Sequence, residues 1–423
     1  MNYARVHCSI PKTLPFLKEK RYNTKNMQLY NSLTQTKQPF TSIIPKQVKM
    51  YVCGITPYDT THLGHAFTYL IFDILQRYLT FKGYTVTYTQ NVTDVDDDLL
   101  KRAKETKKDW EALGQFWTDK FLNDLHALNI IMPTYYVKAT DSIDKIIEIN
   151  QTLIEKNLAY EKEGNVYFRT KTNKEYGKLS RFDRKTMIKL SKERGADPSD
   201  PRKEDPLDFI LWQKSKTDEP YWDSKWGKGR PGWHIECSAM VNEYLGEQID
   251  IHGGGIDLIY PHHESEIAQS ESFTGKIPYV NFWIHTGAVA YQGEKMSKSL
   301  GNLVMVSDLL KAYSPNAIRY LLLSHHYRQG WEYKEGDMEK AEKRVVAIKS
   351  ALNKNLAKKY GEKSQIDNAN HVMEFNSALQ NDLDTPKALK IIDTMAGETS
   401  RTANFENQKT LREMCALLGI TFS

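Results

Sequence analysis

The sequence predicts an α/β protein with a parallel sheet covered by helices, interrupted by an insertion and followed by a helical bundle. Three observations support this fold class. Strand-like apolar runs alternate with helical segments from residue 49 onward, a polar stretch interrupts them near residue 141, and almost everything after residue 307 has helical patterning. Alternating strands and helices favour parallel strands, because each helix returns the chain across the sheet.

The first half of the expected sheet contains two strand–helix units. The apolar run KMYVCG at residues 49–54 predicts a strand, and the segment from His62 to Lys82 predicts a helix that stops at Gly83. The run YTVTYTQNV at residues 84–92 predicts the next strand, which leads through an acidic stretch into another helix. Together they form a βαβα unit.

The rest of the chain divides into an insertion, a second half of the sheet and a helical end. Residues 141–205 combine one helix with a polar stretch rich in Lys, Arg, Asp and Pro, which predicts an insertion. Strand-like runs return after Pro206 in DFILW, QIDIHGGG and VNFWIHTGAV, and we expect all three in the same sheet. From Ser307 onward, lysine-rich helical patterns without a strand candidate predict a small bundle.

The composition excludes several classes of protein. Of the 423 residues, 40% are hydrophobic, and no run approaches the about 18 consecutive apolar residues that a membrane helix needs. The four cysteines are spread over the chain, unlike those of a secreted disulfide scaffold, so we expect a cytoplasmic protein. The net charge of +5 permits a polyanionic partner but does not require one.

The motif HLGH at residues 62–65 predicts an anion-binding site. It starts a helix directly after a strand, where backbone N–H groups and the helix dipole favour a phosphate. Gly64 would let a nucleotide approach the backbone, and the imidazoles of His62 and His65 could stabilise charge on an α-phosphate. A helix cap with two surface histidines is the alternative interpretation.

The motif KMSKS at residues 295–299 lies in a polar loop between Gly293 and Gly301. Lys295 and Lys298 could move with this loop onto the β,γ-diphosphate of a nucleotide and neutralise it as the bond to the α-phosphate breaks. A solvated lysine loop is the alternative. The ordered pair of HLGH early and KMSKS late in the chain is more specific than either motif by itself.

This ordered pair resembles the signature of class I aminoacyl-tRNA synthetases. Further segments resemble the cysteinyl-tRNA synthetase family, namely YVCGITPYD, TQNVTDVDD, GRPGWHIECSAM, DIHGGGIDLIYPHHESEIAQSE and GEKMSKSLGN, covering about Lys49 to Arg328. The resemblance implies a Rossmann-like catalytic domain that activates L-cysteine with ATP and Mg²⁺ as cysteinyl-AMP. It also implies that the histidines of HLGH and the lysines of KMSKS are catalytic.

By the same resemblance, four residues hold one zinc ion (Zn²⁺) per chain: Cys53, Cys237, His262 and Glu266. Two thiolates, one imidazole and one carboxylate are an ordinary zinc ligand set, and His262 and Glu266 at i and i+4 would share a helical face. Spacing alone does not predict the site, because the sequence has no CxxC pair. Without the resemblance, two small buried cysteines are the better interpretation of Cys53 and Cys237.

Zinc would select the substrate, because serine is nearly isosteric with cysteine and an apolar pocket rejects such a neighbour by only ~10². A soft thiolate bound to zinc is a larger difference. The family pattern places Thr93 and Trp233 against the bound cysteine. As alternatives, Thr93 simply ends a strand and Trp233 belongs to the core.

The glycine run after the strand QIDIH resembles the adenosine-binding turn of the family. Glycines allow close backbone approach to a nucleotide, and the following aspartate would bind the ribose hydroxyls, although a plain tight turn is the alternative. His263 is expected to support the neighbouring ligand or simply to pack. The expected ATP contacts are Gly64, Gly253, Gly254, Gly255, Asp257 and Lys298.

We therefore expect five segments: a leader in residues 1–26, the first half of the catalytic domain in 27–140, the insertion in 141–205, the second half with the KMSKS loop in 206–306, and the bundle in 307–423. The leader, which is poor in acids, is either a targeting segment or the product of an early start before Met27. The anticodon-reading domain that follows the bundle in the family is expected to be absent.

The sequence leaves the acceptor of the activated cysteine open. The expected lack of an anticodon domain, with QNVTDVDDDLL and ERGADPSDPRKEDPLD, also resembles ligases that join cysteine to glucosaminyl-inositol in mycothiol biosynthesis. Glu266 and the basic charge favour tRNA(Cys) over such a small amine. A non-catalytic tRNA-binding paralogue and a stand-alone nucleotidyltransferase are further alternatives, against which the intact HLGH and KMSKS argue. Whether the chain is a monomer or a dimer also stays open.

Overall fold

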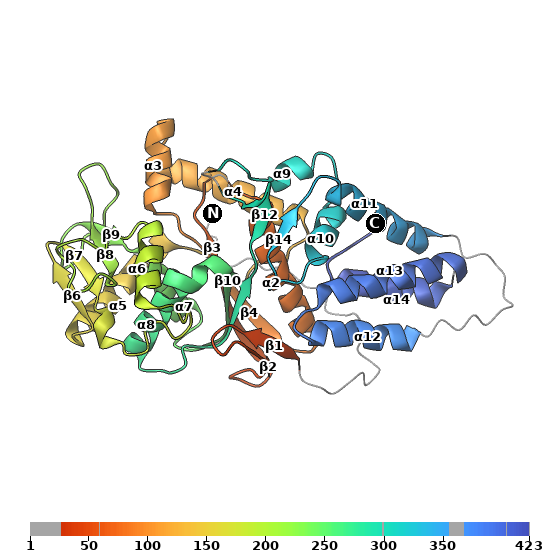
Figure 1. The fold of residues 1–423 in the computed structure, drawn as a ribbon, viewed down its shortest axis with the longest axis horizontal. Coiled ribbons are helices and arrows are strands. Elements are labelled where there is room, and N and C mark those ends of the chain that lie inside the picture. The colour runs from red at the N-terminus through yellow and green to blue at the C-terminus, as the bar shows by residue number, and fades with distance from the viewer. Residues whose placement is uncertain (1–26, 59, 298–299, 355–367, 403, 423) are drawn as a thin grey trace.

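The protein is elongated, with the central sheet between two other parts. The structure, a computed structural model, describes residues 27–58, 60–297, 300–354, 368–402 and 404–422. The insertion lies at one end of the long axis and the C-terminal helices lie at the other (Figure 1). The expected leader, residues 1–26, lies outside the described residues. Within the described ranges, no helix is long and apolar enough to cross a membrane.

The central sheet has five parallel strands in the order β11–β10–β3–β4–β5. They are β3 (Gln47–Ile55), β4 (Thr85–Val92), β5 (Tyr135–Lys138), β10 (Ile249–Gly255) and β11 (Val280–Thr286). The parallel α/β sheet is confirmed, and the runs KMYVCG, YTVTYTQNV, QIDIHGGG and VNFWIHTGAV all contribute strands to it. β5, an edge strand of four residues, was not predicted.

Alternate residues of β3 face two different hydrophobic cores, as the two-residue period of a strand requires. Val48 and Val52 belong to the larger core, which includes helix α2 (Leu63–Phe81). Cys53 belongs to the second core, which includes helix α7 (Trp233–Tyr244). Because both faces of the sheet are covered, a polar group placed on either face is shielded from water.

The insertion forms its own antiparallel sheet in the order β6–β7–β8–β9. Its elements are α5 (Ile143–Glu155), β6 (Ala159–Lys162), β7 (Asn165–Phe168), α6 (Arg184–Glu193), β8 (Phe209–Lys214) and β9 (Gly229–Pro231). The expectation that DFILW returns to the central sheet is therefore wrong, since β8 pairs with β7 and β9. A short buried apolar run has the same pattern in either kind of sheet.

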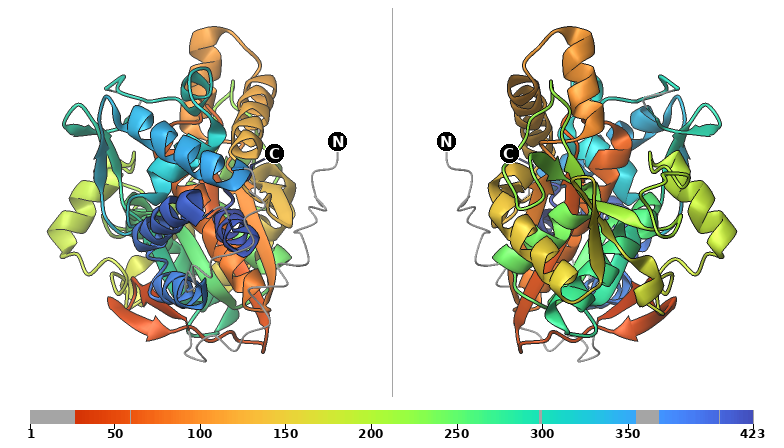
Figure 2. Two further views of the ribbon diagram at one scale, coloured as in Figure 1. Left: turned by 90° about the vertical axis from the view of Figure 1, so that its right-hand side faces the viewer. Right: turned by 90° about the vertical axis from the view of Figure 1, so that its left-hand side faces the viewer.

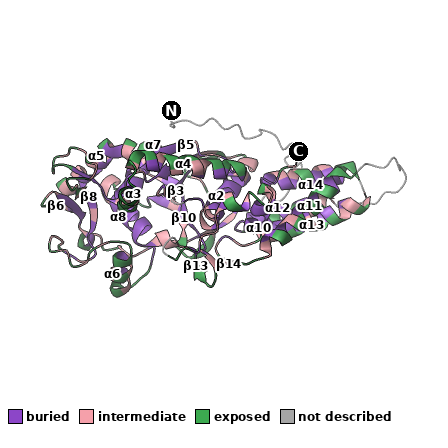
Figure 3. Cartoon of the chain, turned by 90° about the horizontal axis from the view of Figure 1, so that it is seen from above, coloured by how far each residue is buried: buried purple, intermediate pink, exposed green. Residues whose placement is uncertain are grey.

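The C-terminal part is a bundle of helices that shares one hydrophobic core with α2. The helices are α9 (Val306–Leu309), α10 (Pro315–Leu323), α11 (Asp337–Asn353), α12 (Asn368–Gln380), α13 (Thr385–Thr402) and α14 (Phe405–Leu417). The bundle faces the viewer in the left view of Figure 2, and Figure 3 shows its exposed residues on the outside. One expectation is wrong, because β14 (Trp331–Tyr333) pairs with β12 (Val289–Tyr291). The three residues of β14 are too few to show the alternation of apolar and polar side chains that predicts a strand.

The remaining elements connect these parts. A hairpin of β1 (Gln28–Asn31) and β2 (Thr36–Pro39) precedes β3, and β13 (Glu294–Lys295) pairs with β12. Helices α3 (Asp97–Thr106) and α4 (Trp110–Ala127) link β4 to β5, and α8 (Glu264–Thr274) links β10 to β11.

Candidate active site

The candidate site lies where the carboxyl ends of the central strands meet the insertion. A cleft of about 1220 Å³ is lined by Gly54 and Ile55 at the end of β3, by Trp233 at the start of α7, and by residues of the insertion. The carboxyl ends of parallel strands are the usual place for ligands in α/β proteins, because the connecting loops all converge there.

A buried cluster of sulfur, nitrogen and oxygen atoms lies beside this cleft, and it contains all four residues that the resemblance assigns to zinc. Cys53 comes from β3, Cys237 from α7, His262 from the turn before α8, and Glu266 from α8. The two Sγ atoms are 3.8 Å apart, and His262 Nε2 lies 3.3 Å from Cys237 Sγ. Oε1 of Glu266 lies 3.1 Å from His262 Nε2 and 3.7 Å from Cys53 Sγ.

These separations fit the edges of a tetrahedron around one metal ion. An ion about 2.3 Å from each sulfur and about 2.0–2.1 Å from nitrogen and oxygen places its ligands about 3.3–3.8 Å apart. The cluster thus has the donor types and the spacing of a four-ligand zinc site, although the four residues come from separate elements.

Burial shifts the pKa of every expected zinc ligand in the cluster toward its neutral form. Burial raises the pKa of the Cys53 and Cys237 thiols, and it raises the pKa of the Glu266 carboxyl well above its usual value. Burial lowers the pKa of His262 well below its usual value. All four groups are therefore driven toward their neutral forms, and a divalent cation would reverse this for the thiols and the carboxyl.

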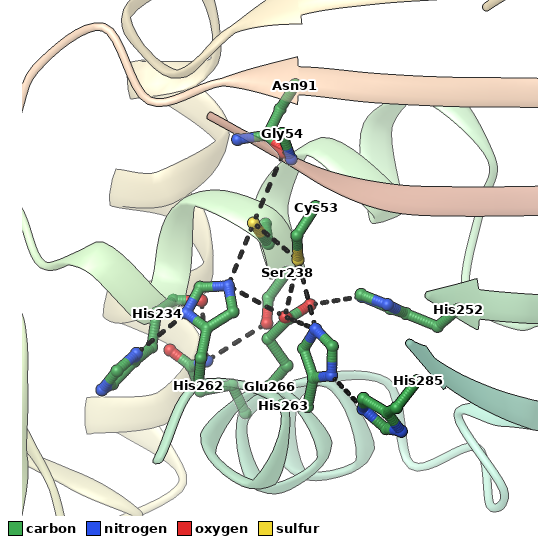
Figure 4. Close-up of polar contacts among 12 residues, drawn as sticks. Cys53, Gly54, Asn91, His234, Ser238, His252, His262, His263, Glu266 and His285 are labelled. Atoms are coloured by element: carbon green, nitrogen blue, oxygen red, sulfur yellow. Dashed lines mark hydrogen bonds and ion pairs between the residues drawn. The ribbon is translucent and has the colours of Figure 1, made fainter. Parts of the chain in front are cut away.

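Four further histidines surround the cluster: His234, His252, His263 and His285 (Figure 4). His252 Nε2 lies 2.9 Å from Oε2 of Glu266, so the two oxygens of this carboxylate face different partners. His263 Nε2 lies 3.3 Å from Cys53 Sγ, and its Nδ1 lies 2.8 Å from His285 Nε2. His263 thus contacts a ligand directly, and with Cys53, His252 and Glu266 it forms a second, overlapping donor set.

Sequence reasoning missed His234, His252 and His285. His234 Nδ1 lies 3.0 Å from His262 Nδ1, which gives this ring a defined orientation. A histidine inside an otherwise apolar strand, as in QIDIHGGG and VNFWIHTG, was a usable signal, because such a buried ring needs a polar partner.

Trp233 and Thr93 occupy different environments near the cluster. The indole of Trp233 lines the cleft and stacks on the ring of His262 at a centroid distance of 4.4 Å. It therefore forms a wall between the cleft and the cluster. Thr93 is buried just after β4, where its hydroxyl accepts a hydrogen bond from Nδ2 of Asn91 at 3.3 Å.

The HLGH motif is at the start of α2, as expected. His62 is the N-cap, and its Nδ1 accepts a hydrogen bond from the backbone N–H of Gly64 at 3.1 Å. The ring of His65 stacks on that of His62 at 3.8 Å and lines the cleft. His62 is thus the helix cap that the alternative interpretation of the motif expects, and His65 also faces the cleft.

The glycines 253–255 are the last residues of β10, paired with β11, and are not a turn that follows the strand. A Cβ on Gly253 would lie 2.0 Å from the Phe72 ring, so this glycine lets α2 pack closely on the sheet. Gly254 faces Leu258 and His263 in the same way. At least for Gly253, helix packing explains the residue without a nucleotide.

Asp257 and Lys295, which the sequence analysis assigned to different parts of the site, are in contact. Lys295 Nζ lies 3.0 Å from Oδ2 of Asp257, and Nη2 of Arg194 lies 3.0 Å from the same oxygen. Burial raises the pKa of the Asp257 carboxyl, but the two cations outweigh burial and the net shift is downward. Lys298 lies outside the described residues.

The parallel sheet, the cleft at its carboxyl edge and the cluster of metal-ligating residue types beside it are typical of an α/β protein that binds its ligands at the carboxyl ends of its strands. The sequence matches the tRNA synthetases class I (C) catalytic domain family over residues 39–343. It is 45% identical over 394 residues to a cysteine–tRNA ligase of Legionella pneumophila, covering 93% of this chain and 85% of that protein. It is 42% identical over 400 residues to a cysteine–tRNA ligase of Dehalococcoides mccartyi, covering 93% and 86%.

The fold resembles a solved methionyl-tRNA synthetase of Mycobacterium tuberculosis in complex with methionyl-adenylate. The TM-score is 0.61 at 16% identity, and the match covers 88% of this chain and 90% of that one. At this identity the likeness shows the fold alone. The sequence matches decide the family: the chain belongs to the class I aminoacyl-tRNA synthetases of the cysteine–tRNA ligase family.

Proposed function

We propose that this protein activates L-cysteine with ATP as cysteinyl-AMP and transfers the cysteine to tRNA(Cys), with one zinc ion holding the cysteine sulfur. The observation that carries the proposal is the buried set of Cys53, Cys237, His262 and Glu266 beside a cleft that also presents His65. Sulfur recognition and nucleotide chemistry thereby share one site. The names of the relatives, cysteine–tRNA ligase, support the same substrate and acceptor.

In the first half-reaction, the carboxylate of cysteine attacks the α-phosphorus of ATP in line and pyrophosphate leaves. His62 and His65 lie at the positive end of α2 and stabilise the charge on the α-phosphate. Lys295 and Lys298 neutralise the departing pyrophosphate, and Asp257 holds the ribose hydroxyls. Mg²⁺ would accompany ATP as part of the substrate and would supply further positive charge to the phosphates. Gly64 leaves room for the nucleotide at the helix start.

The ligand set also supplies the selectivity for cysteine. Zinc held by Cys53, Cys237, His262 and Glu266 would lower the pKa of the substrate thiol and would bind sulfur in preference to the hydroxyl of serine. Trp233 closes one side of the pocket through its stacking on His262, and Thr93 contacts the bound amino acid. This discrimination makes a separate editing step unnecessary.

In the second half-reaction, a ribose hydroxyl of tRNA attacks the carbonyl carbon of cysteinyl-AMP. The ester bond to tRNA forms, the anhydride bond to the phosphate breaks, and AMP leaves. The described cysteines, Cys53, Cys237 and Cys415, are all free thiols, which suits the reducing cytoplasm where tRNA is charged. A small amine such as glucosaminyl-inositol is the competing acceptor that the sequence left open.

Cysteine-dependent exchange of pyrophosphate into ATP tests the first half-reaction, with serine as the comparison. Exchange with cysteine and not with serine is the expected result, and absence of exchange from the zinc-loaded protein contradicts the proposal. For the second half, the enzyme is loaded with cysteine and ATP and offered deacylated tRNA or glucosaminyl-inositol in parallel. Transfer to tRNA alone supports the proposed acceptor, and transfer to the amine alone replaces it.

A further inference from the structure

One carboxylate oxygen at the rim of the cleft joins three distant segments. Oδ2 of Asp257, which follows β10, is 3.0 Å from Lys295 Nζ at the end of β13. The same oxygen is 3.0 Å from Nη2 of Arg194, the residue that follows α6 in the insertion. Asp257 and Arg194 line the cleft with side chains 35% and 38% exposed, and the side chain of Lys295 is 51% exposed.

Arg194 differs from two other arginines that line the cleft, because its carboxylate partner has a role in the proposed reaction. Arg202 pairs with Asp200 in its own loop, and Arg230 pairs with Asp97 at the start of α3. Neither Asp200 nor Asp97 has a role in the proposed reaction, so a nucleotide need not disturb these pairs. Arg194, in contrast, shares its partner Asp257 with a lysine of KMSKS.

A nucleotide that uses Asp257 for its ribose hydroxyls competes with both cations for the same oxygen. Lys295 has a phosphate to move to, since neutralising the leaving diphosphate is the proposed role of the KMSKS lysines. Arg194 starts from the same oxygen and carries a planar guanidinium that matches the geometry of a phosphate better than an ammonium does. Phosphate oxygens of the same nucleotide offer this guanidinium an anionic partner in place of Asp257.

We propose that Arg194 binds a phosphate group of ATP in the cleft, so that the insertion contributes a cation to the nucleotide site. The proposal rests on the proposed function only in placing a nucleotide beside Asp257. It assigns Arg194 a contact with substrate, in addition to the pair that it makes with Asp257.

The test compares the binding of ATP and of adenosine by calorimetry, using the full-length, zinc-loaded protein without cysteine. Arg194→Ala is expected to weaken ATP binding about tenfold or more, because a charge-assisted phosphate contact is lost. Adenosine has no phosphate, so its affinity is expected to stay within about twofold. Lys189→Ala is the matched control, since Lys189 lies on α6 with a side chain 76% exposed and pairs only with the nearby Glu193 among its recorded ion pairs.

An ATP affinity that is unchanged in Arg194→Ala overturns the proposal. An affinity for adenosine that falls as much as the affinity for ATP also overturns it, because Arg194 then only holds Asp257 in place. Arg194→Lys keeps the charge but loses the planar fork, and its ATP affinity is expected between those of wild type and Arg194→Ala. If Arg194→Ala does not fold, Arg194→Lys replaces it in the test, and its affinity for ATP must fall more than its affinity for adenosine. The binding measurement needs no reaction, so the two proposals can fail separately. A lack of cysteine-dependent pyrophosphate exchange contradicts the proposed function, and the comparison of ATP with adenosine still tests the role of Arg194.

Discussion

Two buried polar clusters of this protein differ in how their charges are balanced. On α2, the Asp73 carboxylate accepts hydrogen bonds from Nη2 of Arg319 at 2.6 Å, from Nε of Arg77 at 2.9 Å and from the backbone of Ile131 at 2.9 Å. On α8, the Glu266 carboxylate contacts a thiol and three imidazoles in the described part of the chain.

The comparison separates a structural cluster from a ligand-binding one. Arginine keeps its charge when buried, so the Asp73 cluster contains its own counterions. The imidazoles around Glu266 are neutral at pH 7, because burial lowers the pKa of His252 to about 3 and the pKa of His262 and His263 well below its usual value. A buried set of donors without a fixed cation is the arrangement expected of a metal site.

Removing the counterion of the structural cluster should have the largest effect. Arg319→Met is expected to lower the free energy of unfolding by about 3–5 kcal/mol, because it leaves the Asp73 charge buried with less compensation. Urea unfolding measures this loss. The double variant Arg319→Met with Asp73→Asn is the control, and it should recover part of the loss. If the double variant is the less stable one, the charge balance is not what holds the cluster.

Removing a metal ligand should affect metal binding and discrimination. Cys237→Ser is expected to lose bound zinc and to lower cysteine-dependent pyrophosphate exchange by about 10²-fold or more, with weaker preference for cysteine over serine. Cys415→Ser is the matched control, because Cys415 is buried in α14 within the larger core. Metal content is measured by elemental analysis, and unchanged content in Cys237→Ser would count against the ligand assignment.

Removing a partner of a ligand should have a smaller effect. His252→Ala takes away the group that lies 2.9 Å from Oε2 of Glu266, so the carboxylate is less well oriented. The affinity for zinc is expected to fall about tenfold, as measured by competition with a chelator. An affinity equal to that of wild type would mean that Glu266 is held in place by its other contacts.

The pH dependence of stability should reveal the lowered pKa of Asp73 in the structural cluster. Burial raises the pKa of Asp73, but Arg77 and Arg319 outweigh it and the net shift is downward. The stabilisation from Asp73 is therefore fully present above its unfolded pKa of about 3.9 and is lost as the pH falls through the folded pKa. The difference in unfolding free energy between wild type and Asp73→Asn should be constant near pH 7 and shrink below about pH 4. A difference that does not change with pH contradicts the downward shift.

Some parts of the fold could be predicted from local patterns and others could not. The strand at KMYVCG, the helix after HLGH and its end before Gly83 all depend on near neighbours in the chain. The partner of DFILW did not follow from its pattern, because an apolar run of that length does not encode which strand it pairs with. The three-residue strand β14 exists only because β12 lies beside it.

The candidate site shows the same division. Resemblance in short motifs was enough to name Cys53, Cys237, His262 and Glu266, and the structure brings these four together. His234, His252 and His285 were missed, since a histidine in an apolar strand or helix indicates a polar partner but not which group that partner is. The pairing of Arg194 with Asp257 could not be predicted either, because these residues are 63 positions apart in the chain.

By itself, the sequence determined the parallel α/β class, the family and, through the resemblance of its motifs, the four donor residues, because these depend on short-range pattern and on motif identity. Only the tertiary structure decided that a hydrophobic sheet buries those donors at the spacing of one ion, and that a carboxylate at the cleft rim holds cations from two other segments. Such distances are set by how elements pack, and packing depends on contacts between residues far apart in the chain.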